Sequence, residues 1–309
     1  MLTELYSGSI HIRTKDGSTL AHIASLSGHP ETVLTLLKRG VYLHMPNKTG
    51  ALALHAAART GHSSVVKALL MKGSKVDAKT RSNYTALHLA IEYAKSSVVE
   101  VLLGAGASVH TKGGKNLETP LHIAARIPNG ERCAELLLKC GAAVNARMEN
   151  GESPLHVAAR LGSMKMVQIL LKDGADPVAT SAAAETPFHV AVRACHFEIA
   201  KHLLEFVTRK WDRYDAVNLV NSANSEGETA LHFVTEISPD VMHDEAEDVK
   251  LLHYVLEYNA DPGAQTKLTL ETPLHYAARA GNDQVLSALL NSISTTAVQH
   301  VINRQSRVK

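Results

Sequence analysis

The chain has 309 residues, of which 45% are hydrophobic and 20% charged, with a formal net charge of +2. This composition supplies a large apolar core and excludes wholesale disorder, while the near balance of charge argues against a general nucleic-acid binder. Aromatic residues make up only 4%, so the core must be packed from Ala, Leu and Val, and no apolar run approaches the roughly 20 residues of a membrane span.

A short motif recurs along the chain: a histidine followed two positions later by a small residue, usually alanine. The eight copies are separated by 33, 33, 34, 34, 33, 43 and 43 residues, and their histidines are His22, His55, His88, His122, His156, His189, His232 and His275. The string Thr-Pro-Leu-His occurs at 119–122 and 272–275, with Ser for Thr at 153–156. The first two copies are the most degenerate.

Each copy predicts two short helices. Thr is a good N-cap, and Pro suits the first helical position, where no intrahelical N–H bond is due. Leu121, Ala124 and Ala125 then face inward, and after a polar break a second helix shows the apolar spacing of residues 65–70 and 166–171. A glycine follows the second helix, where a left-handed cap favours it: Gly73, Gly106, Gly141 and Gly174. The residues up to the next Thr are predicted to form an extended turn, here called a finger loop.

Thr, Pro, Leu and His at this period resemble the ankyrin-repeat signature over nearly the whole chain. The resemblance implies an all-α ankyrin-repeat solenoid of about eight repeats, two of them elongated, open at both ends. A partial repeat is expected at 1–16, and the full repeats at 17–49, 50–82, 83–116, 117–150, 151–183, 184–226, 227–269 and 270–309. The last range includes the truncated start of another repeat, so we expect a fragment of a longer array.

The two 43-residue intervals contain insertions of about ten residues. Counting from the repeat histidines places the first after the second helix of the sixth repeat, around residues 209–214, as a longer helix or loop. The second falls between the two helices of the seventh repeat and is acidic, with Glu236, Asp240, Asp244, Glu245, Glu247 and Asp248.

Patterns that would indicate chemistry are weak. The repeat histidines are too far apart to share a metal ion, and Gly113-Gly114-Lys115 lacks the spacing of a phosphate loop. Cys195 and His196 are adjacent, so their side chains point apart on a helix and do not form a nucleophile–base pair. With no metal-type spacing, Cys133, Cys140 and Cys195 are expected to be reduced and to serve packing. We therefore expect no enzyme activity, no catalytic or metal residues and no cofactor.

Four segments, residues 117–127, 193–196, 265–272 and 302–306, resemble the cytoplasmic array of the NompC (TRPN) mechanotransduction channels, as do two elongated repeats in succession. This resemblance implies a force-transmitting segment of a tetrameric cation channel that links the pore to microtubules. It implies a place on the cytoplasmic face of the plasma membrane, including cilia, with this fragment itself soluble. Neighbouring repeats of the parent chain and of other subunits would be its further contacts. The alternative is a generic cytosolic ankyrin scaffold that recruits partner proteins without bearing load.

The finger loops divide by charge. Loops 8–18, 38–51, 72–84 and 104–118 hold eleven basic and three acidic residues, whereas loops 139–152, 172–185, 205–228 and 257–271 hold seven basic and thirteen acidic residues. A solvated surface explains this division, and so does a basic half that docks an acidic partner such as a microtubule. On the second hypothesis, the partner-binding residues are Lys48, Lys75, Lys79, Arg81, Lys112 and Lys115. No nucleic-acid partner is expected.

Overall fold

A computed structural model describes residues 10–236 and 245–292, and these residues form seventeen helices and no strand beyond two isolated bridges. The prediction of an all-helical architecture built from helix pairs is confirmed. The chain divides into two compact units, Met1–Glu149 and Asn150–Lys309, called unit 1 and unit 2 below. The start of the expected partial repeat, before residue 10, and the truncated repeat beyond residue 292 lie outside the described residues.

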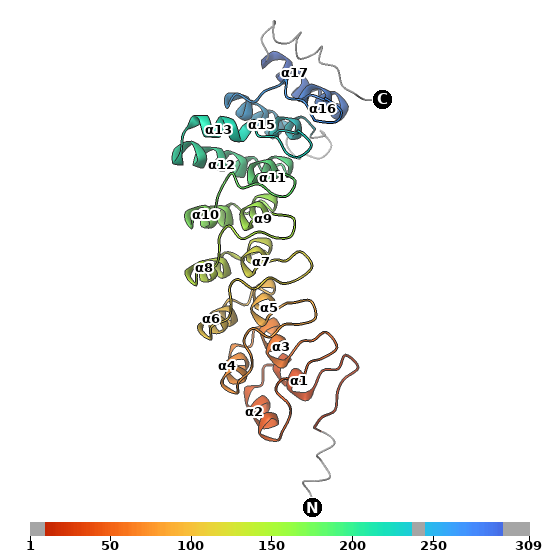
Figure 1. The fold of residues 1–309 in the computed structure, drawn as a ribbon, viewed down its shortest axis with the longest axis vertical. Coiled ribbons are helices and arrows are strands. Elements are labelled where there is room, and N and C mark those ends of the chain that lie inside the picture. The colour runs from red at the N-terminus through yellow and green to blue at the C-terminus, as the bar shows by residue number, and fades with distance from the viewer. Residues whose placement is uncertain (1–9, 237–244, 293–309) are drawn as a thin grey trace, which may run out of the picture. The chain divides into compact units, whose positions relative to one another are not determined.

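Unit 1 contains four helix pairs. The helices are α1 (Leu20–Leu26), α2 (Pro30–Lys38), α3 (Ala53–Thr60), α4 (Ser63–Met71), α5 (Ala86–Glu92), α6 (Ser96–Gly104), α7 (Pro120–Arg126) and α8 (Glu131–Lys139). The first helices of the pairs, α1, α3, α5 and α7, pack in sequence as one row, and α2, α4, α6 and α8 form a second row (Figure 1). We call the first row the inner helices, because the finger loops lie beside it.

Unit 2 repeats this plan with additions. Its helices are α9 (Pro154–Arg160), α10 (Met164–Lys172), α11 (Pro187–Arg193), α12 (Phe197–Lys210), α13 (Arg213–Val220), α14 (Ala230–Glu236), α15 (Glu245–Glu257), α16 (Pro273–Ala280) and α17 (Asp283–Ser292). Here α9, α11, α14 and α16 are the inner helices.

Local sequence explains where the inner helices begin. Proline occupies the first turn of α7, α9, α11 and α16, and Thr or Ser holds the extended N-cap position before it. The repeat histidine stands at the third helical position, where its ring accepts the N-cap N–H bond that a capping-box glutamate usually accepts. The motif therefore both starts the helix and satisfies a backbone donor.

The core consists of the aliphatic residues of both helix rows. Leu121 and Ala124 are fully buried and Ala125 nearly so, which confirms the predicted inward face. Small alanines at these positions let adjacent inner helices approach closely, and each repeat completes the core of its neighbour.

For the first insertion the sequence predicts a longer second helix or a loop, and the structure shows a longer helix together with an additional one. The insertion lengthens α12 to 14 residues and adds α13, which packs on α12. Asp212 caps α13 by accepting a hydrogen bond from the Asp215 N–H at 2.9 Å. Of the acidic insertion, Glu236 ends α14 and Glu245, Glu247 and Asp248 lie in α15, whereas Asp240 and Asp244 lie outside the described residues.

Two glycines of unit 1 provide a test of how closely the loops pack. Gly50 has φ +80°, and an added Cβ would lie 2.8 Å from the Arg81 backbone nitrogen; Gly73 has φ +90° but no atom within 4 Å of such a Cβ. Both alanine variants incur the left-handed strain of roughly 1 kcal/mol, and Gly50→Ala must also displace the next loop. We expect Gly50→Ala to lower the urea midpoint more than Gly73→Ala does. Equal midpoints for the two variants would show that the loops yield without cost.

Candidate functional site

The repeat histidines connect neighbouring repeats. His88 accepts a hydrogen bond from the Thr85 backbone N–H on Nδ1 at 3.1 Å, and its Nε2 lies 3.0 Å from the Thr111 carbonyl of the next loop. Because one ring nitrogen accepts from an N–H and the other faces a carbonyl, the ring must be the neutral tautomer with its proton on Nε2. The same link joins His22 to Ala51, His55 to Ala78, His156 to Glu185, His189 to Ser222 and His232 to Glu271.

Burial makes these histidines structural. It lowers the pKa of His88 to about 4, and it also lowers the pKa of His22, His55, His189 and His232. A proton added at Nδ1 would face a backbone N–H, so the geometry opposes protonation as well. Among the described residues, no group of three or more His, Cys, Asp or Glu side chains is placed to hold a metal ion.

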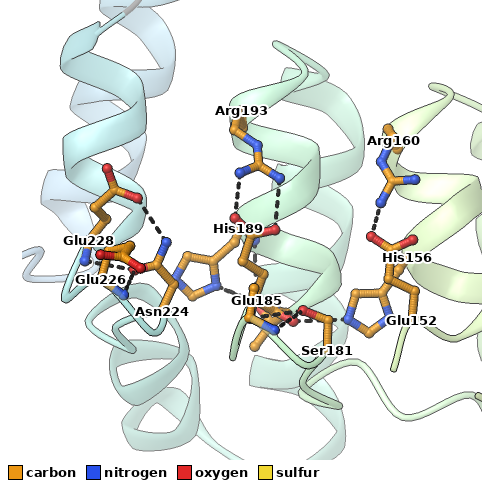
Figure 2. A network of polar contacts seen from close by, with 12 residues as sticks. Glu152, His156, Arg160, Ser181, Glu185, His189, Arg193, Asn224, Glu226 and Glu228 are labelled. Atoms are coloured by element: carbon orange, nitrogen blue, oxygen red, sulfur yellow. Dashed lines mark hydrogen bonds and ion pairs between the residues drawn. The ribbon is translucent and has the colours of Figure 1, made fainter. Parts of the chain in front are cut away.

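A second repeated contact pairs a glutamate just before the inner helix with an arginine near its end. Figure 2 shows two of these pairs in unit 2, Glu152 with Arg160 and Glu185 with Arg193. The glutamates are largely buried, while the arginines are about half exposed. In unit 1, Arg126 lies 3.2 Å from Glu118 and 3.6 Å from Glu92. We call these contacts the Glu–Arg ladder.

The finger loops are joined at their tips by backbone hydrogen bonds. In unit 1, the N–H groups of Lys48, Arg81 and Gly114 donate to the carbonyls of Asp16, Thr49 and Ser82, each at 2.9 Å. In unit 2, Ala182 donates to Asn150, Ser225 to Ala183 and Lys267 to Glu226. Each tip is thus positioned by the tip before it, and side chains there are presented at regular intervals.

The structure leaves all six candidate partner-binding residues exposed on unit 1. Lys48 and Arg81 stand at the linked tips, and Lys115 follows Gly114 at the next tip. Lys75 and Lys79 lie along one loop between its helix and its tip. Lys112 is already engaged, because its Nζ donates to the Arg147 carbonyl at 2.8 Å.

A groove lies between the finger loops and inner helices of unit 1, with a volume of about 300 Å³. Its polar lining comes from successive loops and includes Ser18, Asn47, Thr49, Thr80 and Ser82, and its helix side includes Arg59, Leu89 and Tyr93. The groove was not predicted from the sequence. The signal that could have revealed it was the alignment of equivalent positions, which shows Ala51 in the second repeat where the last five repeats have Glu.

The remaining sequence candidates are local features of the fold. Cys195 and His196 lie in the turn between α11 and α12 and not on a helix; His196 is the N-cap of α12, and its Nε2 donates to the Arg160 carbonyl at 3.0 Å. Gly113 and Gly114 form a loop turn. No cysteine forms a disulfide, but the packing role predicted for all three is wrong for Cys140, which is exposed beyond the end of α8.

Comparison with known proteins identifies the repeats. The family described as ankyrin repeats (3 copies) matches residues 1–80, 21–113 and 87–181, together more than half of the chain, and the single ankyrin repeat matches residues 269–298. A search of curated proteins found no significant match. Within the described residues, no helix has both the length and the apolar character needed to cross a membrane.

Proposed function

The chain belongs to the ankyrin-repeat family, and on this premise we propose that it is a non-catalytic scaffold that docks an acidic protein partner on the finger loops of unit 1. One observation supports this most directly. Backbone hydrogen bonds fix the tips that carry Lys48, Arg81 and Lys115 to one another. None of these three side chains forms an ion pair with another residue in the described part of the chain.

A fixed row of unpaired cations favours an extended acidic surface. Each side chain is exposed, so an isolated contact contributes little, and affinity must come from several contacts made together. Such binding is weakened by salt, because exposed charges are screened beyond about 8 Å at physiological ionic strength. The surface therefore suits a partner that presents many carboxylates in a row.

A more specific form of the proposal assigns this partner as the microtubule and the chain as a force-transmitting segment of a mechanosensory cation channel. It is supported by the resemblance of residues 117–127 and 265–272 to the cytoplasmic array of NompC channels. The pair of elongated repeats adds to it, since α12 with α13 and the long α15 distinguish unit 2 from unit 1. The generic form, a scaffold that bears no load, requires only the docking surface.

Charge reversal tests both forms. The triple variant Lys75→Glu, Lys79→Glu and Arg81→Glu should abolish co-sedimentation of the chain with microtubules at low salt, and it should abolish binding to poly-glutamate. Both interactions should be lost because the variant replaces three exposed cations of one finger loop with anions. Circular dichroism and the urea midpoint check that the variant is folded.

The matched control reverses exposed acids of unit 2, Asp173→Lys with Glu226→Lys, and should leave both interactions intact. Asp176 is unsuitable for this purpose, because its carboxylate accepts the Val178 N–H at 3.1 Å. Binding to poly-glutamate without microtubule pelleting would favour the generic scaffold. Unchanged binding of a folded triple variant to both probes would remove this surface from consideration.

A further inference from the structure

The Glu–Arg ladder depends on two fixed positions in each repeat. The glutamate stands one residue before the N-cap, and the arginine stands four residues after the repeat histidine. Four repeats fill both positions, and their pairs are Glu118–Arg126, Glu152–Arg160, Glu185–Arg193 and Glu271–Arg279. In these repeats the chain itself supplies a carboxylate to the arginine.

The second repeat keeps the arginine and lacks the carboxylate. Arg59 stands four residues after His55, and the glutamate position is occupied by Ala51. Arg59 is exposed and makes no ion pair or side-chain hydrogen bond with any residue that the structure describes. Glu92, at the equivalent position of the next inner helix, lies 3.6 Å from Arg126 instead.

The position that lacks the glutamate lies in the wall of the unit 1 groove. Both Ala51 and Arg59 line it, so the space that a glutamate side chain would fill is part of an open volume of about 300 Å³. Tyr84 and Tyr93 add aromatic surface to its wall. Asp16, its acidic lining residue, accepts hydrogen bonds from the hydroxyls of Thr14 and Ser18 and is thereby occupied within its own turn.

We propose that this groove binds an acidic side chain of an extended peptide segment, which takes at Arg59 the place that the chain's own glutamate takes in other repeats. This inference rests on the proposed scaffold function and deepens it by naming a second contact, separate from the finger tips. A guanidinium binds a carboxylate through two parallel N–H bonds, which gives direction as well as affinity.

The lining favours a peptide over a small anion. Polar groups from three successive loops, such as Ser18, Asn47 and Thr80, are spaced along the groove beside the arginine. The Ser18 hydroxyl donates to Asp16 and the Asn47 Oδ1 accepts from the Ala51 N–H, which leaves the lone pairs of the Ser18 oxygen and the N–H groups of Asn47 Nδ2 for a ligand. Such groups suit the backbone N–H and C=O groups of an extended strand, and the tyrosine rings suit an apolar neighbour of its acidic residue. A lone carboxylate ion would use only Arg59.

Selection from random dodecapeptides displayed on phage, with the whole 309-residue chain as bait, tests the inference. We expect the selected peptides to be enriched in Glu or Asp. A synthetic copy of the strongest peptide should bind Arg59→Ala about tenfold or more weakly, and replacement of its acidic residue by the amide should have the same effect. Ala51→Glu should also weaken binding, because it restores the internal partner of Arg59.

Control variants distinguish a loss of peptide binding from a loss of folding, and binding in the groove from binding at the finger tips. Ala51→Glu adds an ion pair, so its urea midpoint should be at least that of the wild type, and loss of binding then cannot reflect unfolding. Arg160→Ala, which removes a ladder arginine of unit 2, should leave peptide binding unchanged. Peptides without acidic enrichment, equal binding by Arg59→Ala, or displacement by equimolar free acetate would each overturn the inference. Poly-glutamate binding through Lys75, Lys79 and Arg81 would remain as evidence for the proposed function in all three cases.

Discussion

Leu155→Ala is expected to lower the free energy of unfolding of the chain by roughly 2 to 5 kcal/mol, and Leu121→Ala by a similar amount. Both leucines are fully buried in inner helices, Leu155 in α9 and Leu121 in α7. Each substitution removes apolar contacts and leaves a cavity in a core that adjacent repeats share. Urea denaturation followed by circular dichroism measures the effect.

His196→Ala is the matched control for these core variants. His196 is half-buried, packs against Gly162, and makes one side-chain hydrogen bond, to the Arg160 carbonyl at 3.0 Å. Loss of one such bond costs roughly 0.5 to 1.5 kcal/mol, less than an empty leucine site. If His196→Ala proved the more damaging change, the assignment of His196 as an ordinary turn residue would be wrong.

Lowering the pH from 7 towards 4 is expected to destabilise the whole chain. Burial lowers the pKa of His88 from 6.5 to about 4 and that of His22, His55, His189 and His232 in the same direction. Below pH 6.5, the unfolded chain therefore binds protons that the folded chain does not, and stability falls until the folded-state pKa is reached. Between pH 6.5 and 4, His88 alone accounts for roughly 3 to 4 kcal/mol, at about 1.4 kcal/mol per pKa unit.

The urea midpoint at pH 7 and pH 5 measures this loss, and His88→Gln isolates one contribution. The variant should be less stable than the wild type at pH 7, since it loses a buried link to Thr111, but its difference between the two pH values should be smaller. Asp16, with its pKa lowered to about 2 by hydrogen bonds from Ser18 and Thr14, affects stability only at lower pH. An identical pH difference in His88→Gln and wild type would contradict the linkage.

The fold could be predicted because its signals are local and repeated. Thr119 and Pro120 start a helix, and His122 stands where it can bond the cap, all within four residues. Leu121 and Ala124 face inward at helical spacing. Eight copies of one short pattern leave few alternatives for how these helices pack.

The features that could not be predicted from the sequence depend on departures from the repeat pattern or on long-range contacts. Helix α13 arises in inserted residues for which no other repeat provides a template. The groove at Arg59 is lined by Ala51, which has no carboxylate, and that absence has a meaning only once other repeats show Glu paired with Arg. The exposed lysines could be predicted as a charge excess, but the hydrogen bonds that fix Lys48 and Arg81 at adjacent tips are long-range contacts.

Site-resolved lysine labelling tests the docking surface most directly. The whole chain is acetylated briefly with and without saturating poly-glutamate at low salt, and modification of each lysine is measured by mass spectrometry. We predict protection of Lys48, Lys75, Lys79 and Lys115 in the finger loops of unit 1, and no protection of Lys172 or Lys267 in unit 2. Equal labelling of both groups, or protection confined to Lys172 and Lys267, would contradict the assignment of the basic finger loops as the docking surface.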